Sequence, residues 1–342
     1  MLFGFDHLWQ TARCADAKSR TDSRVKSIEF AWVRWRWLIP TETGKIADQR
    51  KRNRQEELGM AKKQTIGSVT ILTGDSRKVL DAIDSGVVQS CITSPPYWGL
   101  RDYDHADQIG SEPSPDLYVE NLVETFRQVR RVLRDDGTLW LNVGDGYARN
   151  GGDGNCGPNA KVGNTKKLIQ KRNCKVPDVW GLKDRDLMGM PWRVAFALQA
   201  DGWILRSRIV WIKKTAMPES VRNRPTTATE ELFLFAKRPS YYYDHQAVRE
   251  ESGANLRNYW ILGPDNSGKG HPAAFPRELA RRCLLLGTRS NDIVLDPFGG
   301  SGTTGAVAEE EGRQAFLVEL NPNYNELAKQ RLKNVQKKLE LT

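Results

Sequence analysis

Apolar and polar residues follow two different spacings along most of this chain, from Ser68 onward. Short apolar runs predict buried strands, and apolar residues that recur every three or four positions predict amphipathic helices. The predicted strands are 68–72, 87–92, 138–143, 203–214, 231–237, 292–295 and 314–318. Helical spacing runs through 79–83, 122–133 and 191–198, and again from 304. Strands that alternate with helices predict the α/β class, with a largely parallel, doubly wound sheet.

Residues 1–59 do not share this alternation. They contain an aromatic and basic patch at 30–37 and a charged run at 48–57, without the pattern of a cleaved signal peptide. Met60 and the following Ala-Lys-Lys resemble a natural start. We therefore expect 1–59 to be an extension, either disordered or assigned upstream of the true start, and 60–342 to form the folded domain. The alternative is a basic arm that contacts nucleic acid.

Two further segments lack clear periodicity. Residues 148–185 are rich in Gly, Asn and Lys, and a connection of this length is either mobile or functional. Its lysines favour contact with phosphate, and the alternative is a solvated loop. Residues 215–270 place basic residues among aromatic ones, a composition that nucleic-acid surfaces use. We expect a nucleic-acid-binding surface there, with ordinary packing as the alternative for the tyrosines at 241–243.

The composition narrows the partners and the setting. At 342 residues with 39% hydrophobic content, the chain is long enough to bury a full core. Its formal net charge of +10, from 52 Lys and Arg against 42 Asp and Glu, favours a polyanionic partner. The chain contains no run of about 18 apolar residues, so a membrane span is not predicted. The five cysteines form no CxxC pair, which indicates a reducing, intracellular setting and neither a zinc site nor a disulfide framework.

The predicted strand at 87–92 ends in an unusual turn, Thr-Ser-Pro-Pro-Tyr-Trp at 93–98. Two consecutive prolines cannot donate the hydrogen bonds of a sheet, so the strand must stop there. The turn offers a serine hydroxyl, proline carbonyls and aromatic rings at the carboxyl end of a strand, where open α/β sheets place their sites. A rigid acceptor beside a stacking ring suits a flat ligand with an exocyclic amine. The alternative is a proline-rich turn against which aromatic side chains pack.

A second candidate site follows the strand at 292–295, in Asp-Pro-Phe-Gly-Gly-Ser-Gly-Thr-Thr at 296–304. Glycines here allow a ligand to approach the backbone, and Glu319 at the end of the next strand suits ribose hydroxyls. The segment is neither GxGxxG nor a phosphate loop, because no Gly-Lys-Ser/Thr follows. The carboxylate of Asp296 is unfavourable for a pyrophosphate and suits a cationic ligand. S-adenosylmethionine, with a ribose, an ammonium and a sulfonium group, matches these features.

Together, the motifs at 93–97 and 296–304 resemble those of the amino-group DNA methyltransferases, in the order of their permuted beta group. The resemblance runs from Ser68 to about Leu332, and 271–276 matches the family motif that holds the methionine moiety. It implies a Rossmann-like S-adenosylmethionine-dependent methyltransferase fold, circularly permuted, with inserted DNA-recognition loops. The expected target-recognition region is 215–270. The implied catalytic residues are Ser94, Pro95, Pro96 and Tyr97, and the implied cofactor-binding residues are Asp75, Phe275, Pro276, Asp296, Phe298, Gly299, Gly300, Ser301, Gly302, Thr303 and Glu319. No metal is implied.

The resemblance also implies roles within the turn. Ser94 Oγ and the Pro95 carbonyl would accept the two N–H groups of the target amine, and Tyr97 would stack on a base flipped out of the duplex. No covalent intermediate with the base is expected, because the nearest thiol, Cys91, lies inside the predicted strand as a core residue.

The resemblance also leads to expectations about the target base and the partners. In this family a serine at the first position, here Ser94, mostly accompanies cytosine-N4 methylation; adenine-N6 methylation is the alternative, and a non-catalytic DNA-binding protein is a third. The expected partner is double-stranded DNA, with a possible cognate restriction endonuclease outside this chain. We expect a monomer or homodimer in the cytoplasm of a bacterial or phage-infected cell, associated with the nucleoid.

Overall fold

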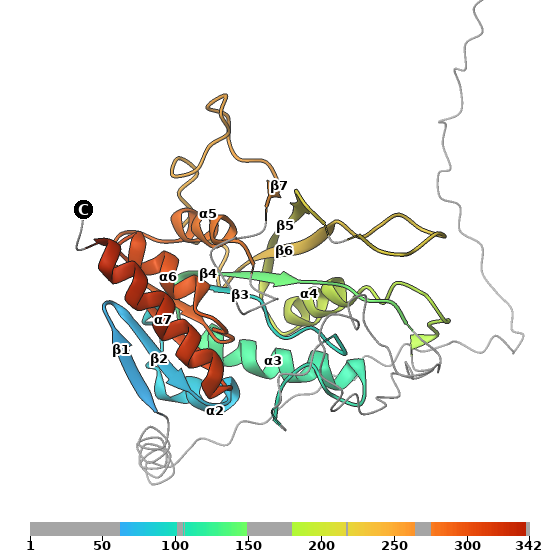
Figure 1. The fold of residues 1–342 in the computed structure, drawn as a ribbon, viewed down its shortest axis with the longest axis horizontal. Coiled ribbons are helices and arrows are strands. Elements are labelled where there is room, and N and C mark those ends of the chain that lie inside the picture. The colour runs from blue at the N-terminus through green and yellow to red at the C-terminus, as the bar shows by residue number, and fades with distance from the viewer. Residues whose placement is uncertain are drawn as a thin grey trace, which may run out of the picture.

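The structure is a computed structural model that describes residues 62–100, 105, 107–148, 180–216, 218–263 and 275–339. The expectations for 1–59, for most of the insert at 148–185 and for residues 271–274 lie outside these residues. The described residues form one nine-stranded sheet in the order β1-β2-β9-β8-β3-β4-β6-β5-β7 (Figure 1). Its strands are β1 Lys63–Ile66, β2 Val69–Thr73, β3 Val88–Thr93, β4 Leu133–Val143, β5 Ile204–Lys213, β6 Thr229–Ala236, β7 Tyr259–Leu262, β8 Ile293–Asp296 and β9 Gln314–Glu319.

The centre of the sheet is parallel, as the alternation of strands and helices predicts. β2, β9, β8, β3 and β4 pair parallel to one another, whereas β6 is antiparallel to both β4 and β5. β1 adds an antiparallel edge, and β7 closes the other side parallel to β5. The carboxyl ends of the five central strands therefore share one edge of the sheet. This edge is where sheets of this class place their ligands.

Helices cover both faces of the sheet, which confirms the doubly wound α/β class (Figure 1). They are α2 Ser76–Val79, η1 Leu80–Ala82, α3 Pro115–Val132, α4 Met190–Ala200, α5 Arg277–Gly287, α6 Thr303–Glu310 and α7 Pro322–Leu339. α2, η1, α3 and α4 contribute to one apolar cluster, and α5, α6 and α7 to the other. Each fully buried Leu or Phe in these clusters contributes about 1.5–3 kcal/mol to folding. None of the helices in the described part of the chain is long and apolar enough to cross a membrane.

The junction between α3 and β4 differs from the predicted one. The predicted helix runs to 133 and the predicted strand begins at 138, with Asp-Asp-Gly at 135–137 between them as a local stop signal. In the structure α3 ends at Val132 and β4 already begins at Leu133. β3 and β4 pair as Val88 with Leu133 and then as Ser90 with Thr138, so the ladder shifts its register across this stretch. A Cβ on Gly137 would lie 2.9 Å from the carbonyl oxygen of Arg134, which explains why a glycine occupies the irregularity. Long-range pairing with β3 overrides the local stop signal.

Four elements have no counterpart among the predicted ones: β1, β7, α5 and α7. β1 and β7 are edge strands of four residues, too short to show a periodicity of their own. Both depend on a partner strand for their conformation. The core position predicted for Cys91 is confirmed, since its side chain on β3 is fully buried.

Candidate functional site

β3 delivers the predicted catalytic turn to the carboxyl edge of the sheet. All six residues of the strand are buried, whereas Ser94 and Tyr97 just beyond it are half-buried. The Tyr118 hydroxyl of α3 donates to the Pro96 carbonyl over 2.9 Å, and Trp98 Nε1 donates to the Glu112 carbonyl over 3.0 Å. The turn is thus anchored from the side of α3. Trp98 itself is buried beneath it as part of the core.

Asp296 connects this turn to the glycine-rich segment that follows β8. Its side chain is only 2% exposed, and Oδ1 accepts from Thr93 Oγ1 at 2.6 Å and from the Phe298 amide at 3.1 Å. Oδ2 accepts from Thr304 Oγ1 at 2.8 Å. Burial raises the pKa of the Asp296 carboxyl to about 6, against the opposing effect of these three hydrogen bonds. All three of these donors belong to the protein. The role of Asp296 in joining the two motifs is therefore enough to explain why its carboxylate is buried.

The segment 297–302 forms a close turn between β8 and α6. Its backbone is held by a hydrogen bond from the Gly299 amide to the Val318 carbonyl over 2.8 Å. Gly302 has a φ of +78°, and a Cβ there would lie 2.8 Å from the Cβ of Ala328. The Ser301 hydroxyl is buried, and among the described residues its oxygen has no hydrogen-bond partner. Glycine at 302 is therefore required by close packing of the turn against α7, and among the described residues the turn leaves one buried polar atom without a partner.

Glu319 and Asp75 extend the site along neighbouring strand ends. Glu319 ends β9, and its carboxylate accepts from the amides of Gly300 and Asn321, both at 2.7 Å. Desolvation raises the pKa of the Glu319 carboxyl, an effect opposed by these amides. Asp75 caps α2 by accepting from the Arg77 amide at 2.9 Å.

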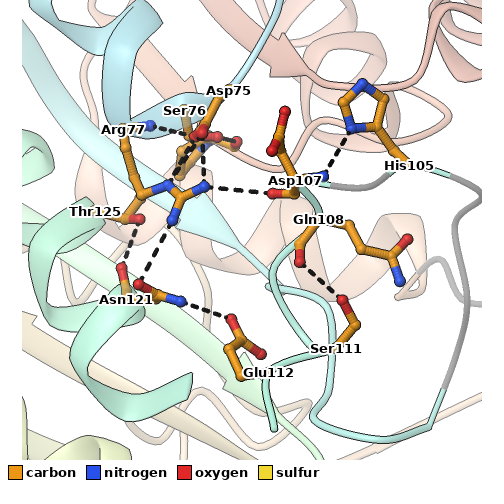
Figure 2. Close-up of polar contacts among 11 residues, drawn as sticks. Asp75, Ser76, Arg77, His105, Asp107, Gln108, Ser111, Glu112, Asn121 and Thr125 are labelled. Carbon is orange, nitrogen blue, oxygen red and sulfur yellow. Dashed lines mark hydrogen bonds and ion pairs between the residues drawn. The ribbon is translucent and has the colours of Figure 1, made fainter. Parts of the chain in front are cut away.

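Arg77 is a residue that the sequence does not reveal as part of this region. Its Nη2 pairs with Asp75 Oδ2 at 2.7 Å and donates to the carbonyl of Asp107, in the loop after the catalytic turn, over 3.3 Å (Figure 2). Figure 2 also shows the guanidinium beside Asn121 of α3. The pKa of Arg77 is raised, chiefly by its hydrogen bond with Asp75. Asp75 is thus held in place by a cation before any ligand arrives.

Phe275 and Pro276 reach the same edge from the other face of the sheet. α5 ends at Gly287, a few residues before β8 begins, so the helix runs antiparallel to β8 and its first turn lies at the carboxyl edge. Pro276 is the residue before the helix, and Phe275 is buried in the cluster formed by α5, α6 and α7. Phe298 points to the opposite face, where its ring meets Phe126 edge-on at 6.5 Å. The strand ends and the first turn of α5 bring every predicted site residue to one edge of the sheet.

Comparison with known proteins identifies the family. Residues 88–330 match the N6_N4 family model, whose members are described as DNA methylases. The chain belongs to this family. The methyltransferase is also 47% identical over 282 residues to the type II methyltransferase M.Cfr9I of Citrobacter freundii, a match that covers 81% of this chain and 92% of that protein. Its identity to M.SmaI of Serratia marcescens is 44%, over 78% of this chain and 91% of that protein.

Solved structures confirm the fold. The PvuII DNA methyltransferase, described as cytosine-N4-specific, matches with a TM-score of 0.60 and 20% identity over 80% of this chain and 92% of that one. TTHA0409 of Thermus thermophilus, a protein described as a DNA modification methylase and solved with S-adenosyl-L-methionine, matches with a TM-score of 0.52. It is 26% identical over 77% of this chain and 94% of that one. The predicted family of amino-group DNA methyltransferases and its Rossmann-like fold are thus confirmed.

The methyltransferase has a second polar group at the turn that the sequence does not indicate. The Tyr97 hydroxyl donates to Glu230 Oε2 over 2.7 Å, and Glu230 Oε1 pairs with Lys213 Nζ at 2.6 Å. Asn142 Nδ2 also donates to Glu230 Oε2, over 3.1 Å. Antiparallel pairing of β6 with β4 creates this contact between residues far apart in sequence. In the sequence, the only mark of this group is that an acidic residue, Glu230, stands at the start of the apolar run that forms β6.

The region from 215 to 270 divides between the two edges of the sheet. β5 and β6 are joined at the edge that carries Ser94, because Ile212 pairs with Thr229. In this connection, Arg224 pairs with Glu219 at 2.7 Å, and its guanidinium lies 4.1 Å from the centre of the Tyr147 ring.

The connection from β6 to β7 begins at the opposite edge of the sheet. The Tyr242 amide donates to the Asp136 carbonyl over 2.9 Å, and the Tyr243 ring stacks on Trp140 at 6.4 Å. Asp136 lies in the first half of β4, away from its carboxyl end. The Arg289 guanidinium lies 3.8 Å from the centre of the Tyr242 ring, so contacts within the chain account for both tyrosines.

Proposed function

We propose that this methyltransferase transfers a methyl group from S-adenosylmethionine to the N4 amine of a cytosine flipped out of duplex DNA. One observation supports this proposal above the others: the hydrogen bond from Thr93 to Asp296. It joins the residue before Ser94 to the first residue of the glycine-rich turn, across the adjacent strands β3 and β8. An amine held at Ser94 and a cofactor held at that turn are therefore neighbours, as direct transfer requires.

The chemistry of the second motif fits S-adenosylmethionine. The turn at 296–303 contains no basic side chain, which suits a ligand without phosphate. Glu319 offers a carboxylate to ribose hydroxyls, and the buried Ser301 hydroxyl lacks a partner among the described residues. When bound, the cofactor supplies a methyl group activated by its sulfonium. The proposed cofactor residues are Asp75, Phe275, Pro276, Asp296, Phe298, Gly299, Gly300, Ser301, Gly302, Thr303 and Glu319, and the TTHA0409 complex with S-adenosyl-L-methionine supports the choice.

At the turn, the chain itself binds and orients the target amine. Ser94 Oγ and the Pro95 carbonyl accept the two N–H groups, which directs the nitrogen lone pair away from them. Tyr97 stacks on the base, and Pro96 keeps the turn rigid. Methylation of a ring carbon through Cys91 is disfavoured, because burial raises the pKa of that thiol well above its ordinary value.

Ser94 favours cytosine over adenine, since serine at this position resembles the cytosine-N4 members of the family. Adenine-N6 methylation is the second candidate, because both amines offer the same two donors. The catalytic turn on β3 precedes the cofactor turn after β8 in the chain, which supports the permuted motif order. The names of the relatives, type II methyltransferases, favour double-stranded DNA as the partner within a restriction-modification system. For target recognition we propose the connection at 215–228, which lies at the catalytic edge.

The test is to identify the methylated product. Duplex DNA of random sequence is incubated with the protein and labelled S-adenosylmethionine, digested to nucleosides and analysed by mass spectrometry. We expect N4-methylcytosine. Detection of N6-methyladenine instead would replace the first candidate by the second. Absence of labelled DNA, with retained binding to the duplex, would favour a non-catalytic DNA-binding protein.

A further inference from the structure

Glu230 accepts a hydrogen bond from Tyr97 of the catalytic turn, and the roles implied by the family motifs do not include it. It lies second in β6, at the carboxyl edge, with its side chain 15% exposed. Its two oxygens contact three side chains: the Tyr97 hydroxyl at 2.7 Å, Lys213 Nζ at 2.6 Å and Asn142 Nδ2 at 3.1 Å. Lys213 on β5 keeps a positive charge beside the carboxylate. Glu230 is thus held as an ionised acceptor.

The donors and acceptors in the hydrogen-bond chain from Ser94 through Tyr97 to Glu230 can be arranged in only one way. An ionised carboxylate only accepts, so the Tyr97 hydroxyl must donate its proton to Glu230. The Tyr97 oxygen is then free to accept, and it receives the Ser94 hydroxyl proton over 3.2 Å. Ser94 Oγ, whose only proton is now committed, can offer its lone pairs alone. A target amine, which brings two N–H donors, finds an acceptor at this atom.

The Tyr97 ring is held in place as well as its hydroxyl. A Cβ on Gly144, just beyond β4, would lie 2.5 Å from Tyr97 Cε2, so the ring rests directly against the backbone of that glycine. The hydroxyl at the end of the same ring is hydrogen-bonded to Glu230 of β6. The stacking face and the hydroxyl of Tyr97 are therefore positioned by separate neighbours.

We infer that Glu230 is a positioning residue, which acts through the Tyr97 hydroxyl to set Ser94 Oγ as an acceptor for the target amine. This inference rests on the proposed function, because it needs an amine bound at Ser94. Without the carboxylate, the hydroxyls of Tyr97 and Ser94 can reverse their hydrogen bonds. Ser94 would then point its proton at the amine and repel it.

The test compares two neighbouring carboxylates of β6. Glu230→Gln replaces an acceptor by a group that can also donate. Glu231→Gln is the matched control, because Glu231 also pairs with a basic residue of β5, Arg208, at 2.5 Å, and has no contact with Tyr97. Single-turnover methyl transfer and binding of duplex DNA and cofactor are measured for both. We expect Glu230→Gln to slow transfer about 10- to 100-fold, the range for losing one hydrogen bond to a charged group, with DNA affinity unchanged.

Repeating the substitution in a Tyr97→Phe variant distinguishes a positioning role of Glu230 from a general loss of structure. In Tyr97→Phe, which keeps the ring and removes the hydroxyl, adding Glu230→Gln should cost less than about twofold, because the two groups act as one chain. Equal slowing in both backgrounds would overturn the inference, as would a Glu230→Gln rate equal to that of Glu231→Gln. If the Glu230→Gln protein does not fold, Tyr97→Phe alone must still slow transfer. A wild-type protein that methylates no DNA would refute the proposed function and this inference together, whereas an active wild type with an undiminished Glu230→Gln refutes the inference alone.

Discussion

Asp296 should make the stability of this methyltransferase depend on pH in an unusual direction. Its carboxyl is buried between β3 and β8, and burial raises its pKa from 3.8 to about 6. Since one pKa unit corresponds to about 1.4 kcal/mol, the charged carboxylate destabilises the folded protein by about 3 kcal/mol. The folded state holds this proton more tightly than the unfolded state does. The contribution of Asp296 to stability is therefore greatest below pH 3.8 and is lost as the pH rises through about 6.

The substitution Asp296→Asn isolates this effect. The amide can still accept from Thr93 and the Phe298 amide at one oxygen, while Thr304 Oγ1 can turn its own proton to the Ile92 carbonyl, 3.3 Å away. We expect the free energy of unfolding of the variant to exceed that of the wild type by about 1 kcal/mol near pH 4.5 and by about 3 kcal/mol near pH 8.

Urea unfolding at several pH values, followed by circular dichroism, measures this difference. Subtracting the wild-type free energy of unfolding from that of the variant at each pH cancels the contributions of all other titrating groups. Asp84→Asn, at an exposed position, serves as the control for an amide substitution alone. A difference that stays constant, or shrinks, as the pH rises would show that Asp296 is not a buried carboxylate that ionises at a cost.

Three further substitutions test the proposed site. Ser94→Ala should slow methyl transfer about 100-fold or more without weakening DNA binding, and an unchanged rate would exclude the serine from the reaction. Glu319→Gln should weaken the binding of S-adenosylmethionine, measured by calorimetry, about tenfold, and an unchanged affinity would show that Glu319 does not bind the cofactor. Gly144→Ala should displace the Tyr97 ring and slow transfer about tenfold, whereas Gly146→Ala, whose Cβ would meet only the Met188 methyl group at 3.0 Å, is its control.

Local patterns in the sequence are enough to predict the α/β class, most central strands and the two motifs. Apolar spacing indicates strands and helices, two prolines end β3, and glycines mark the turn after β8. Because parallel strands end at one edge, the strand-end positions of Ser94, Asp296 and Glu319 also predict that they gather there. The core position of Cys91 follows from the same local pattern.

How those residues are held depends on contacts that form only in the folded chain. The link from Thr93 to Asp296 spans 203 positions of the sequence, and the link from Tyr97 to Glu230 spans 133. Neither has a local signal, because each depends on which strands become neighbours in the sheet. β4 pairs with β3 on one side and with β6 on the other through backbone hydrogen bonds that many sequences could form, and these two pairings bring Glu230 to the catalytic turn. Local spacing thus specifies what lies at each strand end, while the order of strands specifies which of these groups can touch.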